Sequence, residues 1–567
     1  MKPVFRHGRD LTVPFLIAFL ALRPFPALGQ VEEITPPAAG QEAGGGEADA
    51  ASFTISGFRV EGNTLLPEKP ILLDEEMPIL IPNLADILEE FTGDGKSIQD
   101  VEAARTKLEK SYHDLGYPTV LVNVPNQTLE EGIVLLEVVE GKVRRVRVTG
   151  NRYFTMADIV KDLPTLKPGV IIYLPRLQEE LMVVNTHPDM KVEPTLMPGK
   201  DPGTVDVELK VEDKMPLHGS LELNNRNSVD TTDLRLNGIL RYDNLWQKGH
   251  SASGQFQTSP QDTDEVQVLS ASYVLPPPWQ DEHRLAFFSI WSDSQTAFGE
   301  GFQSIGSGFI AGIRYVIPLT PYAMYTHNFT AGLDYKDFDE TVGFTGEVDL
   351  TTPMQYWPMS FSYSGTLPDE GGLTIFSAAL NMSLRELGTD PDQFAIKRYQ
   401  SRGGYLYGTF GVERRQKLPW QTALYSKLDG QIASEPLISN EQYTTGGMES
   451  IRGFKEASEA GDNAIHFTTE WSAPDLLKID NEKIPCNFEP FLFYDFAALS
   501  MKYPLEGQDT SFNLSGAGAG IRGMIAKHYS FEADWAMALT SSSEVSTGEP
   551  KVSAGDQEIY FKVKYTF

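Results

Sequence analysis

Hydrophobic and polar residues alternate along the second part of the chain. In the closing segment, residues 558–567 (EIYFKVKYTF), large apolar side chains occupy every second position and mostly polar ones the positions between. Residues 530–539 (SFEADWAMAL) and 328–336 (NFTAGLDYK) repeat this pattern. Because successive side chains of a strand point to opposite faces, this period of two predicts strands with one apolar and one wet face.

The length of these runs indicates that the strands cross a membrane. Strands of soluble sandwiches usually have about five or six residues, whereas these runs have nine or ten, the length that a tilted strand needs to cross hydrocarbon. A sheet in lipid must close so that no edge is left unpaired. Residues 217–567 therefore predict a transmembrane β-barrel. Sixteen strands would allow about 22 residues per strand and connection, although about fourteen or eighteen remain open.

Aromatic residues near the predicted strand ends suit the two interfacial belts of such a barrel. These are Tyr242, Trp357, Tyr494 and Tyr560.

The first residues predict a secretory signal peptide. Three basic residues precede a mainly apolar run at 11–22, and Ala27 and Gly29 place small side chains at the −3 and −1 positions of a cleavage site. The run contains a proline and is too short for a bilayer core of about 30 Å, so a membrane anchor is the weaker alternative. We expect a signal peptide at 1–29 and a disordered leader, rich in Pro, Gly, Ala and Glu, at 30–52.

Two related segments follow the leader. FRVEGNTLL (58–66) and VRVTGNRYF (146–154) both predict a strand that enters a Gly-Asn turn. After the first, residues at helical spacing predict a helix with Gly116 as its C-terminal stop: Val101, Ala104, Leu108 and Tyr112. Similar patterns follow the second, so each unit is predicted to be a small β-α-α-β-β domain. The alternative is one α/β domain in which the second Gly-Asn turn is coincidental.

Composition narrows the functional classes. A formal net charge of −31 and a pI near 4.7 disfavour nucleic-acid binding, because phosphate recognition needs clustered Lys and Arg. The single cysteine, Cys486, cannot form an intramolecular disulfide or supply the paired ligands of a zinc module. The nine histidines show no ligand spacing such as H-x-x-x-H, so we expect no metal site.

One apparent enzyme motif lies in a strand context. GAGIRG at 518–523 matches the dinucleotide-binding fingerprint, but the sequence after it continues as an alternating strand and offers no helix for a phosphate. Its glycines are better explained by a bend of the barrel or by a close neighbour. G-x-S-x-G does not occur, which argues against a lipase-like domain. We therefore expect neither an enzyme nor a cofactor.

A glycine-rich segment with one arginine interrupts the alternation. Residues 446–454 read GGMESIRGF, in which the glycines permit sharp turns of the backbone. On these residues alone, the simplest interpretation is an external loop with a solvated Arg452.

Several motifs together resemble the outer-membrane transporters of two-partner secretion, of the hemolysin and filamentous-haemagglutinin secretion type. They are GNTLL, SYHDLGY, VPNQ and VVEGKV in the first repeat, YDNLWQKGH after the second, and NEQYTTGGMESIRGF followed by GDNA. The resemblance implies two periplasmic α+β domains of the POTRA type, at 53–143 and 144–216. It implies that a barrel of about 16 antiparallel strands follows at 217–567, in the cell outer membrane. The wider superfamily includes barrel-assembly factors.

The resemblance also implies a gate. In this superfamily a loop with a V/I-R-G-F/Y tetrad folds into the barrel, and its arginine meets the aspartate of an F-x-D-x-G motif on the wall, where such a charge-assisted pair is strong. The corresponding loop residues are Ile451, Arg452, Gly453 and Phe454, after Gly446 and Gly447. The corresponding wall residues are Phe493, Asp495 and Ala497. Ala497 stands where the family has glycine, which puts the close approach of loop and wall in doubt.

The implied function is secretion of a protein partner. POTRA domains would capture an unfolded exported protein, such as a large β-helical exoprotein, and the barrel would pass it to the surface. Tyr565 and Phe567 would form a C-terminal signal for insertion into outer-membrane lipid by the barrel-assembly machinery. Two alternatives stay open: an insertase, which usually has three or more repeats, and a passive porin-like channel, which needs none. Some relatives plug the pore with an N-terminal helix, but residues 30–52 have no helical pattern.

Overall fold

The computed structural model describes most of the chain after residue 51. The described residues are 52–66, 71–72, 80–81, 83–229, 231–294, 307–322, 324–343, 349–384, 391–476, 485–506, 509–542 and 552–567. The predicted signal peptide and all of the predicted leader except Ser52 lie outside them. The described chain forms two compact units, one ending at Met215 and the other beginning at Pro216. No helix among these residues has the length and apolar character to span a membrane.

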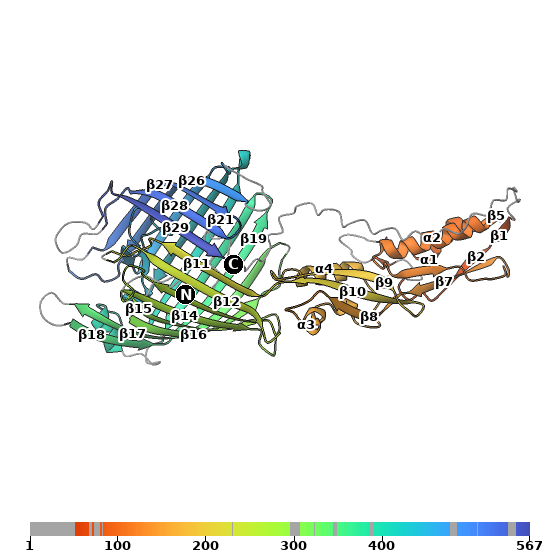
Figure 1. The fold of residues 1–567 in the computed structure, drawn as a ribbon, viewed down its shortest axis with the longest axis horizontal. Coiled ribbons are helices and arrows are strands. Elements are labelled where there is room, and N and C mark those ends of the chain that lie inside the picture. The colour runs from red at the N-terminus through yellow and green to blue at the C-terminus, as the bar shows by residue number, and fades with distance from the viewer. Residues whose placement is uncertain are drawn as a thin grey trace. The chain divides into compact units, whose positions relative to one another are not determined.

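The first half of the N-terminal unit is a small α+β domain (Figure 1). Its elements are β1 (Phe53–Ile55), β2 (Gly57–Glu61), β3 (Ile71–Leu72), β4 (Leu80–Ile81), α1 (Leu84–Leu88), η1 (Glu89–Phe91), β5 (Gly93–Lys96), α2 (Ile98–Asp114), β6 (Val120–Asn123) and β7 (Ile133–Glu140). Three of the strands form a sheet in the order β2-β7-β6, with β2 parallel and β6 antiparallel to β7.

The predicted helix is confirmed. The four residues at helical spacing are the buried residues of α2: Val101, Ala104, Leu108 and Tyr112. Ser97 and Asp100 cap its first turn reciprocally, and Gly116 lies just past its end with a positive φ of 95°, the usual helix-stopping position for glycine.

The second half repeats this architecture. Its elements are β8 (Lys142–Thr149), α3 (Met156–Lys161), η2 (Pro164–Leu166), α4 (Leu174–Val184), β9 (Met190–Pro198) and β10 (Thr204–Asp213). The sheet order is β8-β10-β9, with β8 parallel and β9 antiparallel to the central strand β10, as in the first half. Each half therefore has the β-α-α-β-β arrangement that the sequence predicts, with its own hydrophobic core.

The two Gly-Asn turns are structural equivalents. Gly62 and Gly150 have φ of 83° and 85°, and a Cβ on either would lie within 2.4 Å of a carbonyl oxygen of the neighbouring last strand. The side chains of Asn63 and Asn151 each donate to a carbonyl three residues later, at 2.8 Å. A coincidental second turn is thereby excluded.

The two halves also contact each other. The backbone N–H of Leu174, at the start of α4, donates to the carbonyl of Gly116, just past α2, at 2.8 Å. The rings of Tyr117 and Tyr173 lie 5.2 Å apart across the same joint. The tandem repeat is thus a continuous body rather than two domains on a loose linker.

The C-terminal unit is a closed antiparallel β-barrel (Figure 1). Its strand segments are β11 (Leu217–Asn224), β12 (Arg235–Leu245), β13 (His250–Thr258), β14 (Val266–Leu275), β15 (Arg284–Ser294), β16 (Ser307–Pro318), β17 (Thr326–Gly343), β18 (Asp349–Tyr356), β19 (Pro358–Asp369), β20 (Gly372–Ser383), β21 (Tyr405–Lys417), β22 (Ala423–Ala433), β25 (Asn463–Ser472), β26 (Cys486–Ser500), β27 (Ser511–Ile525), β28 (Tyr529–Ala538) and β29 (Gln557–Thr566). The connections carry α5 (Pro391–Lys397), η3 (Pro419–Gln421), η4 (Ser439–Glu441), β23 (Tyr443–Thr445) and β24 (Glu459–Gly461).

The barrel has sixteen strands in the described chain, because β18 and β19 are two parts of one strand. Both pair with β17, and the register runs on from Lys336 opposite Tyr356 to Leu333 opposite Met359 without a shift. The predicted fold class is therefore confirmed, and the open choice among strand numbers is settled at sixteen.

The alternation of the strands is turned inside out relative to a soluble protein. In β29, Ile559 is 66% exposed and Val563 also faces outward, while Lys562 and Lys564 are buried. β28 follows the same rule, with Trp535 outward and Asp534 inward. Outward apolar and inward polar faces are what a barrel in a bilayer needs.

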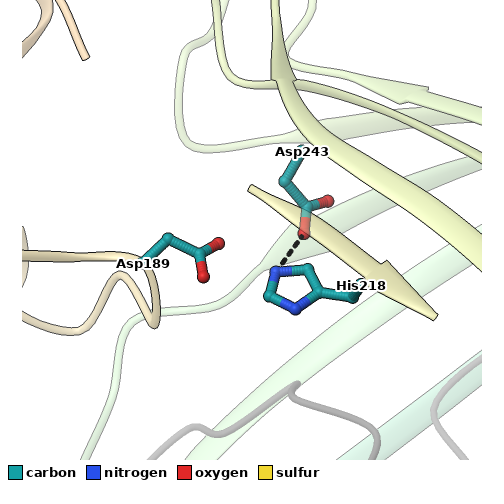
Figure 2. Close-up of side chains that lie close together, drawn as sticks. All are labelled: Asp189, His218 and Asp243. Atoms are coloured by element: carbon teal, nitrogen blue, oxygen red, sulfur yellow. Dashed lines mark ion pairs between the residues drawn. The ribbon is translucent and has the colours of Figure 1, made fainter. Parts of the chain in front are cut away.

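The ring closes between its first and last strands. β11 pairs with β29 from Ser220 opposite Thr566 to Asn224 opposite Lys562. Gly219 and Phe567 exchange two backbone hydrogen bonds at 3.1 and 3.0 Å, so Phe567 completes the seam. At the start of β11, His218 Nε2 lies 3.6 Å from Asp243 Oδ2 of β12, an ion pair when the imidazole is protonated (Figure 2).

Candidate functional site

The site is the long connection between β22 and β25, residues 434–462, which we call the inner loop. A short antiparallel ladder of β23 with β24 forms its stem. Gly446 and Gly447 follow this ladder with φ of 111° and 102°, values that strain any residue with a Cβ. The chain therefore turns sharply there, and the tip (Met448 to Phe454) folds against the barrel wall, as the following contacts show.

The structure brings Arg452 and Asp495 together. Arg452 Nε donates to Asp495 Oδ2 at 2.7 Å and Nη2 donates to Oδ1 at 2.8 Å, a bidentate pair. The backbone N–H of Arg452 adds a third bond to Oδ2 at 3.2 Å. Both residues are 0% exposed, so the interpretation of Arg452 as a solvated loop residue is wrong.

Further wall groups complete the surroundings of the guanidinium. Glu470 of β25 accepts from Arg452 Nη1 at 2.7 Å, and Asp534 Oδ2 of β28 lies 3.5 Å from the same nitrogen. The ring of Phe493 lies 3.4 Å from the guanidinium carbon, a cation–π contact. Arg522 of β27 in turn donates to the second oxygen of Glu470 at 3.1 Å. Sequence reasoning missed Glu470 and Asp534, although their place on the inward, polar face of alternating strands was a signal.

The tip of the loop is held by Tyr560 of β29. Gly453 N–H donates to the Tyr560 hydroxyl at 2.9 Å, and that hydroxyl donates to the Phe454 carbonyl at 2.7 Å. Tyr560 is only 2% exposed, so its expected place in an interfacial belt is wrong. Successive side chains of a strand point to opposite faces, so Tyr560 points inward because its neighbour Ile559 points outward. Trp357 and Tyr494 of the same predicted set do face outward.

Glycines of β27 make room for the tip. A Cβ on Gly516 would lie 1.8 Å from the Arg452 carbonyl oxygen, and a Cβ on Gly453 would lie 2.7 Å from the Ala538 nitrogen. The GAGIRG motif lies in the same strand, β27, which confirms its interpretation as barrel strand with close neighbours. Ala497 is buried in one cluster with Ile451 and Phe454, so alanine at this position is compatible with close packing.

Three more ion pairs hold the tip and the residues just after it. Arg226, just after β11, donates to Glu449 at 2.8 Å and to Glu456 at 2.9 Å. Lys455 donates to Glu558 of β29 at 2.7 Å. The contacts of the tip therefore run from β25 through β29 to the end of β11.

Comparison with known proteins identifies the kind of barrel that carries this loop. Residues 355–523 match haemolysin secretion/activation proteins of the ShlB/FhaC/HecB type, and residues 79–141 match the ShlB-type POTRA domain. Two separate regions of the chain, one in the N-terminal unit and one in the barrel, are thus similar to this family. The matched region includes both the inner loop and the strand that carries Asp495.

Two transporter proteins are similar to large parts of the chain. The outer membrane transporter CdiB of Dickeya dadantii is 23% identical over 391 residues, 65% of this chain and 66% of that protein. The heme/hemopexin transporter protein HuxB of Haemophilus influenzae is 20% identical over 487 residues, 84% of each chain.

Among solved structures, CdiB from Escherichia coli covers 94% of this chain and 93% of its own with a TM-score of 0.59 at 19% identity. BamA from Haemophilus ducreyi lacking POTRA domains 1–3 reaches 0.55 at 14% identity, covering 91% of this chain and 100% of its own. These likenesses show the shared fold. With its closed barrel, its POTRA match and these relatives, the chain is an outer-membrane barrel protein with periplasmic POTRA domains.

Proposed function

We propose that this protein is an outer-membrane translocase that binds an unfolded exported protein with its POTRA domains and secretes it through the barrel. The POTRA domains would span 53–143 and 144–216, and the barrel 217–567. The inner loop would gate the passage, with Ile451, Arg452, Gly453 and Phe454 as its tip and Gly446 and Gly447 as its turn. Phe493, Asp495 and Ala497 would form the wall that receives it.

The buried pair of Arg452 and Asp495 carries the proposal. A guanidinium in a closed barrel is tolerable only when carboxylates satisfy it, and breaking a buried pair strongly favours rearrangement. Such a pair gives the loop a defined closed position. A ligand that binds Arg452 or Asp495 in place of its partner would release the loop from that position. This is a property of a gate, and an open porin has no use for it.

The POTRA sheets offer the means of capture. β2 and β9 are edge strands of their three-stranded sheets, where an extended segment of cargo can add as a further strand. Backbone bonding of this kind tolerates many cargo sequences and needs the cargo unfolded. Folding of the cargo at the cell surface would then drive the transfer, because no ATP is available outside the inner membrane.

The last strand serves insertion in this proposal. Tyr565 of β29 and Phe567 just after it would be recognised by the barrel-assembly machinery, and their exposed side chains would afterwards face outer-membrane lipid.

Export by cells tests the proposal. Cells would express the protein with and without residues 53–216, together with a candidate cargo encoded by a neighbouring reading frame. Heat-modifiable electrophoretic mobility would confirm that each barrel is inserted. We expect export to vanish on deletion while the barrel stays folded. If no cargo depends on the protein and other outer-membrane barrels fail to assemble without it, the translocase proposal is wrong and an insertase replaces it.

A further inference from the structure

Glu441 is a second buried carboxylate of the inner loop, on the arm that leads from β22 toward the tip. It ends η4 and is 4% exposed. Lys336 Nζ of β17 donates to its Oε1 at 2.5 Å, and the Tyr356 hydroxyl of β18 donates to the same oxygen at 2.6 Å. The Tyr407 hydroxyl of β21 donates to Oε2 at 2.8 Å. One loop side chain therefore binds three different wall strands.

The strands that bind Glu441 and the strands that bind Arg452 lie on opposite sides of β22, the strand from which the loop begins. In ring order, β17, β18 and β21 precede β22, where the loop leaves the wall, whereas the Arg452 contacts lie on strands that follow it. Glu441 and Arg452 thus attach one loop to two separate arcs of the barrel.

The segment of the inner loop around Glu441 packs in a hydrophobic cluster and is hydrogen-bonded to the end of the loop. Leu437 and Ile438 belong to the hydrophobic cluster that includes Phe338, Phe394 and Tyr405. Asp462, near the end of the loop, accepts from the Leu437 N–H at 2.9 Å and from Gln442 Nε2 at 3.1 Å. Few water molecules can compete inside such a cluster, so the ionic contacts of Glu441 are strong and removing one partner is costly.

We propose that Glu441 is a second anchor of the inner loop, a positioning residue that the closed state of the barrel requires in addition to Arg452. This inference rests on the proposed gating function. The carboxylate carries the closing contact, and Lys336, Tyr356 and Tyr407 receive it. Breaking the contact frees the first arm of the loop even when the tip contacts of Arg452 are intact, so the barrel opens more often.

Ion conductance of the purified full-length protein in planar bilayers tests this anchor. Glu441→Gln keeps the side-chain shape and removes the charge, and Lys336→Met removes the partner. Each should raise the open fraction on the order of tenfold, which corresponds to about 1.4 kcal/mol. The matched control is Asp369→Asn, which breaks the ion pair between the end of β19 and Arg414 of β21, and its open fraction should stay at the wild-type value. Heat-modifiable mobility must show all variants folded.

Further variants make the test specific. The double variant Glu441→Gln/Lys336→Met should resemble either single variant, because the two changes remove one interaction. Additive effects would overturn the pairing. Tyr407→Phe removes a single hydroxyl and should give a smaller rise, which keeps the test valid even if a charge variant fails to fold.

Arg452→Ala measured beside these variants separates the two proposals. A higher open fraction with Arg452→Ala but an unchanged one with Glu441→Gln would overturn the second anchor and leave the gating loop standing. Unchanged conductance in both would overturn the gating function, and the anchor with it. Raised open fractions in both would support both.

Discussion

Arg452 and Asp495 lie 43 residues apart in the chain and meet through two parallel hydrogen bonds of 2.7 and 2.8 Å, with no solvent exposure on either side chain. The arginine comes from a loop and the aspartate from the wall strand β26, so this contact fixes the position of the loop against the barrel. The sheet itself does not depend on it, because the strands are held by their own backbone ladder. Loop position and barrel integrity can therefore be separated experimentally.

Removing the arginine should impair the gate without unfolding the barrel. Arg452→Ala leaves Asp495 and Glu470 as adjacent buried carboxylates, and a broken buried pair costs about 3–5 kcal/mol, so the closed loop position is lost. We expect export to fall strongly while heat-modifiable mobility shows an inserted barrel. Arg414 of β21 pairs with Asp369 at the end of β19, so Arg414→Ala is the control and should export normally. Normal export with Arg452→Ala would contradict the role assigned to the loop.

The two partners should be coupled. Because Arg452 and Asp495 share one bidentate contact, the double variant Arg452→Ala/Asp495→Ala should lose little more export than the more severe single variant. Arg452→Ala leaves the Asp495 carboxylate without its bidentate partner, and Asp495→Ala in the double variant removes that carboxylate. Export of the four proteins of the cycle measures the coupling. Full additivity of the two single effects would mean that the residues do not act together.

A methyl group on β27 should displace the tip. In Gly516→Ala the new Cβ would lie 1.8 Å from the Arg452 carbonyl oxygen, and overpacking of this kind costs about 1–3 kcal/mol. We expect a higher open fraction in planar-bilayer recordings. Gly254→Ala in β13 is the matched control, because its Cβ would have Ser270 O at 3.9 Å as its near neighbour. Equal behaviour of the two variants would show that the tip does not need the space beside Gly516.

The seam between first and last strand should depend on one amide side chain. Asn225 Nδ2 donates to the Ile559 carbonyl and its Oδ1 accepts from the Phe561 N–H, both at 2.7 Å, so it extends the pairing beyond the end of β11. Each bond contributes about 0.5–1.5 kcal/mol, and Asn225→Ala should therefore speed amide exchange at Phe561.

The control for the seam is Asn487→Ala, which removes a comparable bond to the Met524 N–H between β26 and β27, away from the seam. This variant should leave exchange at Phe561 unchanged. Protection at Phe561 that survives the loss of Asn225 would show that the backbone ladder alone closes the ring.

The sequence by itself determined the architecture. Alternation over nine or ten residues specified long strands, and the Gly-Asn turns specified two repeated domains, because these periods follow from the geometry of the backbone alone. The buried face of α2 could be read from Val101, Ala104, Leu108 and Tyr112 for the same reason. The tip residue Arg452 and its partner Asp495 were found by their resemblance to family motifs, since nothing local links residues so far apart.

Only the tertiary structure decided which groups surround the tip. Nothing in the sequence marks Glu470 and Asp534 as neighbours of Arg452, Tyr560 as a partner of the tip, or Lys336 as the partner of Glu441. These groups meet because closure of the ring brings distant strands together. The direction of Tyr560 shows the reason most clearly: its neighbour Ile559 faces outward, so strand register sets the tyrosine inward, where the loop is. Register and ring closure are properties of the whole sheet, and no local stretch of sequence contains them.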